Sequence, residues 1–139
     1  MTASFDADHV ATLLAELHTL FAALSAAYVF GSAVHNQMHA ESDIDVAIDI
    51  GRELTSAERW HATQRLSLCM MRDVDLIDFR VASDVLRHQI LTTGRRLFAR
   101  NEAAQSSYEA AVLSEYFDFI AQRAPLMQDI ARRGYVYAR

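Results

Sequence analysis

The sequence predicts an α+β fold with α/β-like alternation, in which helices flank a small mixed β-sheet and a long helical segment follows at the C-terminus. Three observations predict it. Apolar residues recur every three or four positions over residues 6–25, as in an amphipathic helix. Residues 43–50 alternate between polar and aliphatic, as in a strand. Residues 102–133 keep a helical pattern, and the 139-residue length fits one domain.

The first two elements are a helix and a buried strand. Asp6 or Asp8 can cap the helix over residues 6–25, because an Asp side chain accepts the unpaired N–H groups of a first turn. Ala26–Phe30 is a short apolar run containing Tyr and Val, which is typical of a buried strand.

A turn and a second strand follow. Gly31 and Ser32 interrupt the first strand, and residues 32–36 are predicted to form one helical turn. Asn36 can end that turn in a left-handed conformation. In the second strand one face carries acids and an alanine, while the other is entirely aliphatic. The two sets are Asp43, Asp45, Ala47 and Asp49, and Ile44, Val46, Ile48 and Ile50.

The second half contains two further helix–strand pairs and the long helix. Thr55 and Glu58 form a capping box that opens a helix to about residue 70, and residues 74–79 are a third strand. The next helix is short. Ser83 caps its start, and Gly94 ends it. An edge strand is predicted at residues 96–99. The helical segment 102–133 follows, and Pro125 is predicted to kink or split it.

Charge is distributed unevenly along the chain. Residues 1–50 contain seven acids and no Lys or Arg, whereas residues 51–139 contain thirteen Arg and eleven acids. A phosphate held by the acidic half therefore needs divalent cations, Arg from the other half, or both. The sequence contains no basic stripe, which disfavours direct nucleic-acid binding.

Cysteine content and hydropathy bear on the compartment. Cys69 is the single cysteine, so it cannot form an internal disulfide, and this suits a reducing compartment. No basic stretch precedes an apolar run at the N-terminus, and no apolar run reaches the ~20 residues that cross a bilayer. We therefore expect a cytoplasmic protein without a membrane partner.

Asp43 and Asp45 are candidate metal ligands. Residues i and i+2 of a strand share a face about 6–7 Å apart, where two carboxylates repel each other without a cation. Mg²⁺ prefers oxygen ligands and commonly joins one or two carboxylates to substrate phosphates. Gly31 and Ser32 add a phosphate site, since they combine free N–H groups at a helix start with a residue that lacks Cβ.

A third carboxylate would complete a two-metal centre, and the third strand offers two on opposite faces. Asp75 is preferred because it lies among aliphatic residues near the start of the strand, where an acid is costly unless it has a partner. Asp78 would then point away, to cap a backbone group or to pair with an Arg.

A two-part motif resembles the signature of the polymerase-β-like nucleotidyltransferase superfamily. It consists of Gly31-Ser32, a spacer of ten residues and Asp43-x-Asp45. The runs YVFGSAVHNQMHAESDIDVAI and DVDLIDFRVASDVLRHQIL more closely resemble the MNT-domain antitoxins (minimal nucleotidyltransferases) of HEPN/MNT toxin–antitoxin pairs. The resemblance covers about residues 26–100. It implies a sheet of the polymerase-β nucleotidyltransferase type. Relatives often carry Gly at the position of Asn36.

The resemblance also implies a reaction. Members of that family use ATP and Mg²⁺, with two ions expected, to attach AMP to a tyrosine hydroxyl of a HEPN ribonuclease toxin, which silences it. Gly31 and Ser32 would hold the triphosphate. Asp43 and Asp45 would bind the metals. Asp75 would bind the metal nearest the attacking hydroxyl and help to remove its proton. The chain has no Lys, so Arg must contact pyrophosphate, with Arg65 and Arg80 as the alternatives.

Two alternatives remain beside AMP transfer to a toxin. The protein could neutralise the toxin by stoichiometric binding, or it could adenylylate a small molecule such as an aminoglycoside. In either case residues 1–100 are predicted to be the minimal nucleotidyltransferase domain. Residues 101–139 are predicted to be a helical extension that packs on the same domain or on a partner.

Several other residues are given structural roles. Asp49 is predicted to lie on the surface and Cys69 to be a core residue, and Trp60 is predicted to serve packing rather than binding. His35 and His39 have i, i+4 spacing, but a zinc site is disfavoured because no further His or Cys lies nearby.

Overall fold

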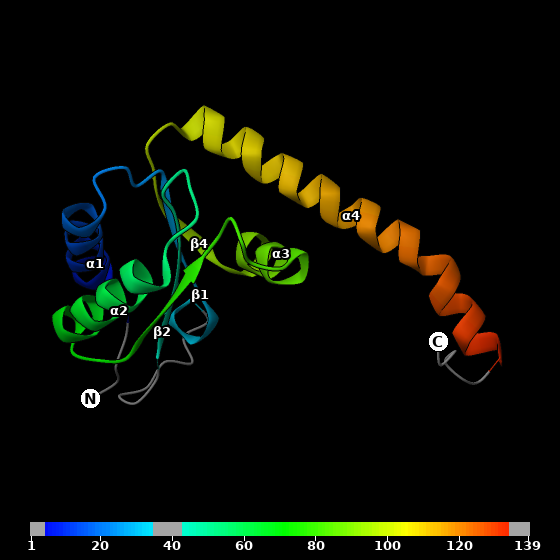
Figure 1. Ribbon diagram of the computed structural model, residues 1–139, viewed down its shortest axis with the longest axis horizontal. Helices are drawn as coiled ribbons and strands as arrows, with labels where there is room; N and C mark the ends of the chain where they lie inside the picture. The colour runs from blue at the N-terminus through cyan, green and yellow to red at the C-terminus, as the bar shows by residue number, and fades with distance from the viewer. Residues whose placement is uncertain (1–4, 35–42, 134–139) are drawn as a thin grey trace.

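Four strands form a mixed sheet in the order β3-β2-β1-β4, and helices lie on both sides of it (Figure 1). This computed structural model describes residues 5–34 and 43–133. The strands are β1 (Ala26–Phe30), β2 (Ile44–Asp49), β3 (Val74–Asp78) and β4 (Arg95–Ala99). The helices are α1 (Ala7–Leu20), α2 (Ser56–Met70), α3 (Asp84–Thr93) and α4 (Glu102–Arg133), with a 3-10 turn η1 (Gly31–Ala33) after β1. The predicted α+β class is confirmed.

The strand pairing fixes which residues become neighbours across the sheet. β1 runs antiparallel to both β2 and β4, whereas β2 and β3 are parallel. Phe30 of β1 lies opposite Asp45 of β2, and Asp45 lies opposite Asp75 of β3. β3 and β4 are the outer strands, as predicted for β4.

Both faces of the sheet are buried, which explains why every residue of β1 is buried. On one face α1 and α2 pack over the aliphatic side of β2, with fully buried Leu13, Leu17 and Leu66. On the other face α3 and the start of α4 cover Tyr28 and Phe79. Each helix therefore buries an apolar stripe against one face of the sheet, as layered α+β packing requires.

Helix capping follows the sequence closely. Asp6 accepts the N–H groups of Asp8 and His9 at the start of α1, and the Thr55–Glu58 capping box opens α2. Ser83 caps α3 through the N–H of Leu86. The predicted turn over residues 32–36 begins with η1, and its last residues, His35 and Asn36, lie outside the described residues, as does His39.

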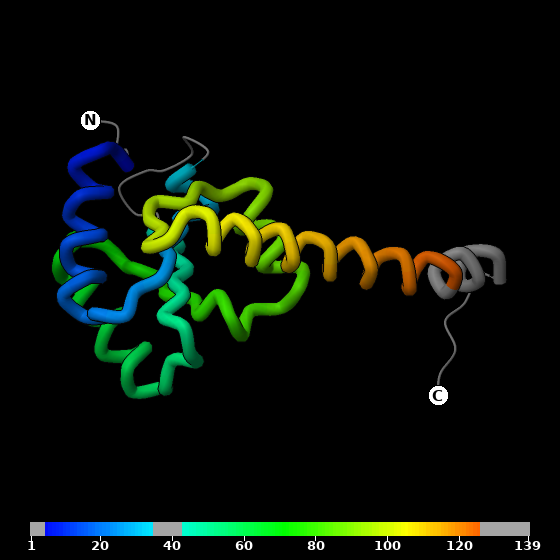
Figure 2. The backbone as a smooth tube through the Cα atoms, turned by 90° about the horizontal axis from the view of Figure 1, so that it is seen from above, coloured from blue at the N-terminus to red at the C-terminus, as the bar shows by residue number. Residues whose placement is uncertain are grey.

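The long helix α4 runs through Pro125 without a break, so of the predicted kink or split the split does not occur. Its start is bonded to the sheet through Tyr28, whose hydroxyl donates to Glu109 at 2.6 Å and accepts from Gln105 at 2.7 Å. Further along, Phe117 is 61% exposed, and α4 extends past the sheet in both views (Figures 1 and 2). Across the described residues, no helix combines the length and hydropathy that a membrane span needs.

Asp49 was predicted to lie on the surface, and the structure corrects this. Its side chain is 1% exposed and accepts from Arg80 Nε at 2.7 Å and from the N–H of Gly51 at 2.8 Å. The cause is long-range, because Tyr108 of α4 lies over the Arg80 guanidinium and closes this end of the sheet. The Asp49–Arg80 pair therefore joins the end of β2 to the loop that follows β3.

Removing the Arg80 side chain is expected to destabilise the protein by about 2 kcal/mol, because a buried Asp49 carboxylate would lose its cation. Urea unfolding of Arg80→Ala measures this. The control is Arg52→Ala, which breaks a solvent-exposed pair with Glu58 and is expected to change the free energy of unfolding much less. Equal losses in the two variants would contradict a structural role for the buried pair.

Candidate active site

Gly31 lies directly against the Asp45 carboxylate. It follows β1 with φ +72°, and a Cβ at this position would overlap Asp45 Oδ2 and lie 3.4 Å from Asp45 Cγ. Two constraints therefore require glycine here. The left-handed backbone disfavours other residues, and the space for a side chain is already taken by the carboxylate.

Asp45 and Asp75 face each other across two parallel strands. They are register partners in β2 and β3, and neighbouring strands lie about 4.8 Å apart. Strand alternation puts both on the face that carries Ala47, the one covered by α3 and α4, and Asp43 precedes β2 with the same parity. Asp45 is half-buried, whereas Asp43 and Asp75 are exposed. The three acids therefore form a row whose inner member is shielded and whose outer members face solvent.

The three carboxylates lie close enough for their negative charges to affect one another. The pKa of Asp45 is raised above the usual range of a carboxyl, first by burial, then by the charge of Asp75 and then by that of Asp43. In the part of the chain that the structure describes, no three Asp, Glu, His or Cys side chains are grouped closely enough to enclose a metal ion. The arrangement fits an open site in which one or two carboxylates and substrate phosphates share a hard cation.

The raised pKa of Asp45 predicts a stability change with pH. Between the unfolded pKa of 3.8 and the raised folded pKa, the folded state binds the proton more tightly, so stability increases as pH falls through this window. At pH 7 without metal, Asp45→Asn removes the repulsion and is expected to stabilise the protein by up to about 1 kcal/mol, since solvent screens the site.

Thermal melts in EDTA at pH 7 and pH 4.5 test this expectation. Wild type should gain stability at the lower pH relative to Asp45→Asn, and Glu53→Gln, an exposed acid after β2, serves as the control. A lower melting temperature for Asp45→Asn at pH 7 would contradict the repulsion.

The structure separates the two candidates for the third carboxylate. Asp75 lies beside Asp45, whereas Asp78 is buried on the opposite side of β3. Asp78 accepts the N–H of Leu54 at 2.7 Å and that of Arg80 at 3.1 Å, so it holds two loops at the far end of the sheet. Ser32 lies in η1, directly after Gly31.

Neither predicted pyrophosphate contact lies beside the carboxylate row. Arg65 pairs with Glu16 between α2 and α1, on the opposite face of the sheet, and Arg80 is bonded to Asp49 at the other end of β2. Arg59 of α2, which was not predicted as a contact, lines the same pocket as Asp75, and its Nε donates to the carbonyl of Leu76.

Arg59 belongs to a pocket of about 340 Å³ that sequence reasoning missed. It is lined by Ser56, Arg59, Trp60, Thr63 and Asp75. Trp60 was predicted to pack, yet it is 68% exposed. The i, i+3, i+4 and i+7 spacing of the four α2 residues could have shown that they share a helix face, but not that this face meets Asp75.

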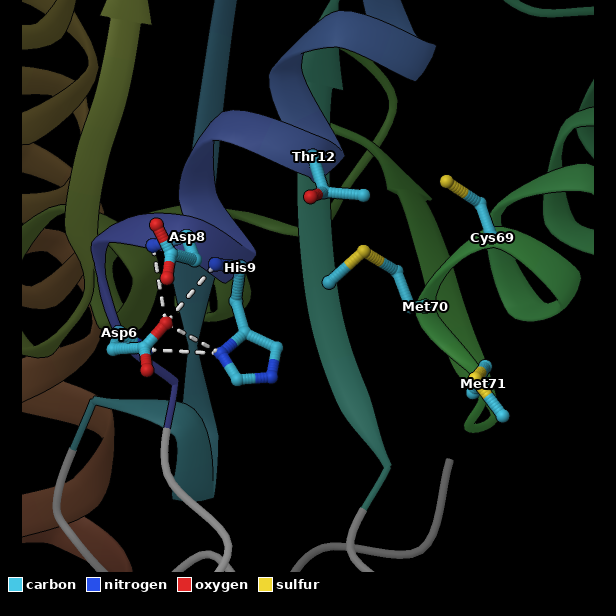
Figure 3. Close-up of a pocket in the computed structure, with 7 residues that line it drawn as sticks. All are labelled: Asp6, Asp8, His9, Thr12, Cys69, Met70 and Met71. Atoms are coloured by element: carbon cyan, nitrogen blue, oxygen red, sulfur yellow. Dashed lines mark hydrogen bonds and ion pairs between the residues drawn. The ribbon is translucent and has the colours of Figure 1, made fainter.

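A second pocket lies between the start of α1 and the end of α2 and includes Cys69 (Figure 3). Cys69 was predicted to be a core residue, which is wrong, because the thiol is exposed and Met70 takes the buried position instead. In Figure 3 the His9 ring turns toward Asp6, to which it is bonded at 2.7 Å. The helices that form this pocket cover the face of the sheet opposite the carboxylate row.

Comparison with known proteins gives consistent matches. A family model described as polymerase beta, nucleotidyltransferase matches residues 14–103, which include Gly31, Asp45 and Asp75. Protein adenylyltransferase MntA of Shewanella oneidensis is 33% identical over 103 residues, which are 74% of this chain and 73% of that protein.

Solved structures extend the match beyond residue 103. A chain in the crystal structure of a toxin–antitoxin with AMP-PNP superposes with a TM-score of 0.79 and 30% identity, covering 88% of this chain and 98% of that one. A chain in the structure of tri-AMPylated Shewanella oneidensis HEPN toxin in complex with MNT antitoxin gives a TM-score of 0.73 and 28% identity, covering 88% and 95%.

Proposed function

The chain belongs to the polymerase-β nucleotidyltransferase family, and on that premise we propose that it is an antitoxin that transfers AMP from ATP to a tyrosine hydroxyl of a HEPN ribonuclease toxin. The observation that carries the proposal is the register of Asp45 opposite Asp75, with Gly31 fitted against Asp45. The similarity to protein adenylyltransferase MntA and to a chain in a complex with an AMPylated HEPN toxin supports the choice of donor and acceptor. The cytoplasm, where ATP is abundant and thiols stay reduced, is the proposed compartment.

The carboxylate row would hold Mg²⁺, and the residues present fit that group. Asp43 and Asp45 supply only oxygen, the ligand that Mg²⁺ prefers, and the repulsion around Asp45 falls once a cation is shared. Asp75 would complete the site for a second ion. When bound, the ions neutralise charge on the triphosphate and on the departing pyrophosphate.

The proposed transfer uses each residue in one role. Gly31 and Ser32 offer backbone N–H groups to the triphosphate at the turn after β1. The Asp75 carboxylate accepts the proton of the tyrosine hydroxyl, whose oxygen forms a bond to the α-phosphorus. The bond from that phosphorus to the oxygen bridging the β-phosphorus breaks. Pyrophosphate leaves, AMP remains on the tyrosine oxygen, and Asp75 passes the proton to solvent.

Incubation with ATP labelled at the α-phosphate, MgCl₂ and the HEPN protein encoded beside it tests the proposal. We expect label on the toxin and loss of its ribonuclease activity. Omission of this chain, and ATP labelled at the γ-phosphate, are the controls, because neither should label the toxin. No label on a toxin that is still neutralised would remove AMP transfer from the proposal.

Neutralisation by binding alone is a second candidate, and one observation favours it. The part of α4 beyond the sheet exposes Phe117 (61%) and Ile120 (46%), which is apolar surface available to a partner. We also propose that residues 1–100 are the minimal nucleotidyltransferase domain and residues 101–139 a helical extension. The packing of Tyr108 and Val112 against the sheet supports attachment of its first turns to that domain.

A further inference from the structure

We infer that the pocket between α2 and the outer edge of β3 receives the acceptor tyrosine, and that Trp60 orients its ring toward Asp75. The inference rests on the proposed function, since it names where the acceptor of the same transfer binds. It concerns the pocket lined by Ser56, Arg59, Trp60, Thr63 and Asp75.

The order of the strands sets the direction of approach. Gly31 follows β1, Asp45 is on β2 and Asp75 is on β3, so the phosphate turn, the shielded carboxylate and the exposed carboxylate follow one another across the sheet. An in-line displacement requires the attacking oxygen to approach the α-phosphorus opposite the departing pyrophosphate. With the triphosphate held at the β1 side, the hydroxyl approaches from the β3 side, where residues 5–34 and 43–133 add no further strand.

The pocket on that side has the chemistry that a phenol needs. Its volume of about 340 Å³ admits one aromatic side chain, and Asp75 lines it at the outer edge of β3. One wall is Trp60, which is 68% exposed rather than packed in the core. Aromatic rings attract one another beyond the area they bury, and exposed Trp is enriched where protein partners bind.

The backbone of β3 favours entry of a side chain over addition of a strand. Arg59 Nε donates to the carbonyl of Leu76 at 2.9 Å, and the N–H of Val74 donates to Ser67 Oγ at 3.0 Å. Two backbone groups of this outer strand are therefore already bonded by α2, which blocks the edge. The other N–H groups of Arg59 bond no described residue, so they remain available to the carbonyls of a tyrosine-bearing segment.

Steady-state AMP transfer tests the inference, with the HEPN toxin varied at saturating MgATP. Trp60→Ala is expected to raise the KM for the toxin at least 10-fold with little change in kcat, and Trp60→Phe should restore much of the loss. Leu68→Ala is the matched control, because Leu68 is 77% exposed on the same helix but does not line the pocket. MgATP binding by calorimetry should be equal in all four proteins.

An unchanged KM for the toxin in Trp60→Ala would overturn the inference, and Trp60→Phe and Trp60→Gln decide the question if the alanine variant melts early. Absence of transfer by wild type would instead overturn the proposed function. Trp60 is the only tryptophan, so its fluorescence gives a readout without turnover. N-acetyl-L-tyrosinamide should shield it from acrylamide, whereas N-acetyl-L-leucinamide should not, and equal quenching with both would overturn the stacking contact.

Discussion

Replacing Asp43 and Asp45 together by Asn is expected to reduce AMP transfer to the HEPN toxin by at least ~10³-fold while the protein stays folded. Asn keeps the shape of Asp but removes the negative charge, so the row would no longer hold cations beside the phosphates. The substitutions should not unfold the protein, because in the metal-free protein the charges of Asp75 and Asp43 repel that of Asp45, and Asn at positions 43 and 45 removes this repulsion. The double variant should therefore melt at or above the wild-type temperature in EDTA.

Single-turnover labelling of the toxin measures the loss, and Glu53→Gln serves as a control for removal of an exposed acid outside the row. Calorimetry should also show weaker uptake of the Mg-nucleotide by the double variant. Wild-type labelling by Asp43→Asn/Asp45→Asn would exclude the carboxylate row as the active site. Full protection of cells without labelling would instead favour neutralisation by binding.

Local sequence patterns predicted the elements because their signals are local. The Thr55–Glu58 capping box marked the start of α2, and Ser83 marked that of α3. The predicted helix over residues 6–25 ends at Leu20 instead, although Phe21 and Leu24 are both buried. Apolar periodicity therefore reported burial correctly there, but burial in a turn rather than in a helix.

Contacts between residues far apart in the sequence determine which side chains of β2 and α2 are buried, and local sequence patterns could not predict this. Alternation placed Asp45 and Asp49 on one face of β2, but the same face is an open site at one end and a closed core at the other. The difference arises from α4, which packs at the Asp49 end from more than fifty residues later in the chain. The exposure of Trp60 likewise depends on how α2 packs against β3, which the apolar periodicity of α2 does not report.

Gly31→Ala is expected to lower AMP transfer by about 10²-fold or more and to destabilise the protein by about 1–2 kcal/mol. The stability cost comes from the left-handed backbone at φ +72°. The loss of activity has a separate cause, because the added Cβ would occupy the position of Asp45 Oδ2 and force the carboxylate out of the row. Urea unfolding measures the first effect, and labelling of the toxin at saturating MgATP measures the second.

Gly51→Ala separates these two causes. Gly51 has φ +82°, so alanine meets comparable backbone strain, but its Cβ would find only Ser25 Oγ at 4.0 Å. The two variants should therefore lose similar stability, while Gly51→Ala keeps wild-type transfer and Gly31→Ala does not. Equal transfer by both variants would mean that the Asp45 carboxylate can shift without consequence, and the close contact with Gly31 would then play no part in the reaction.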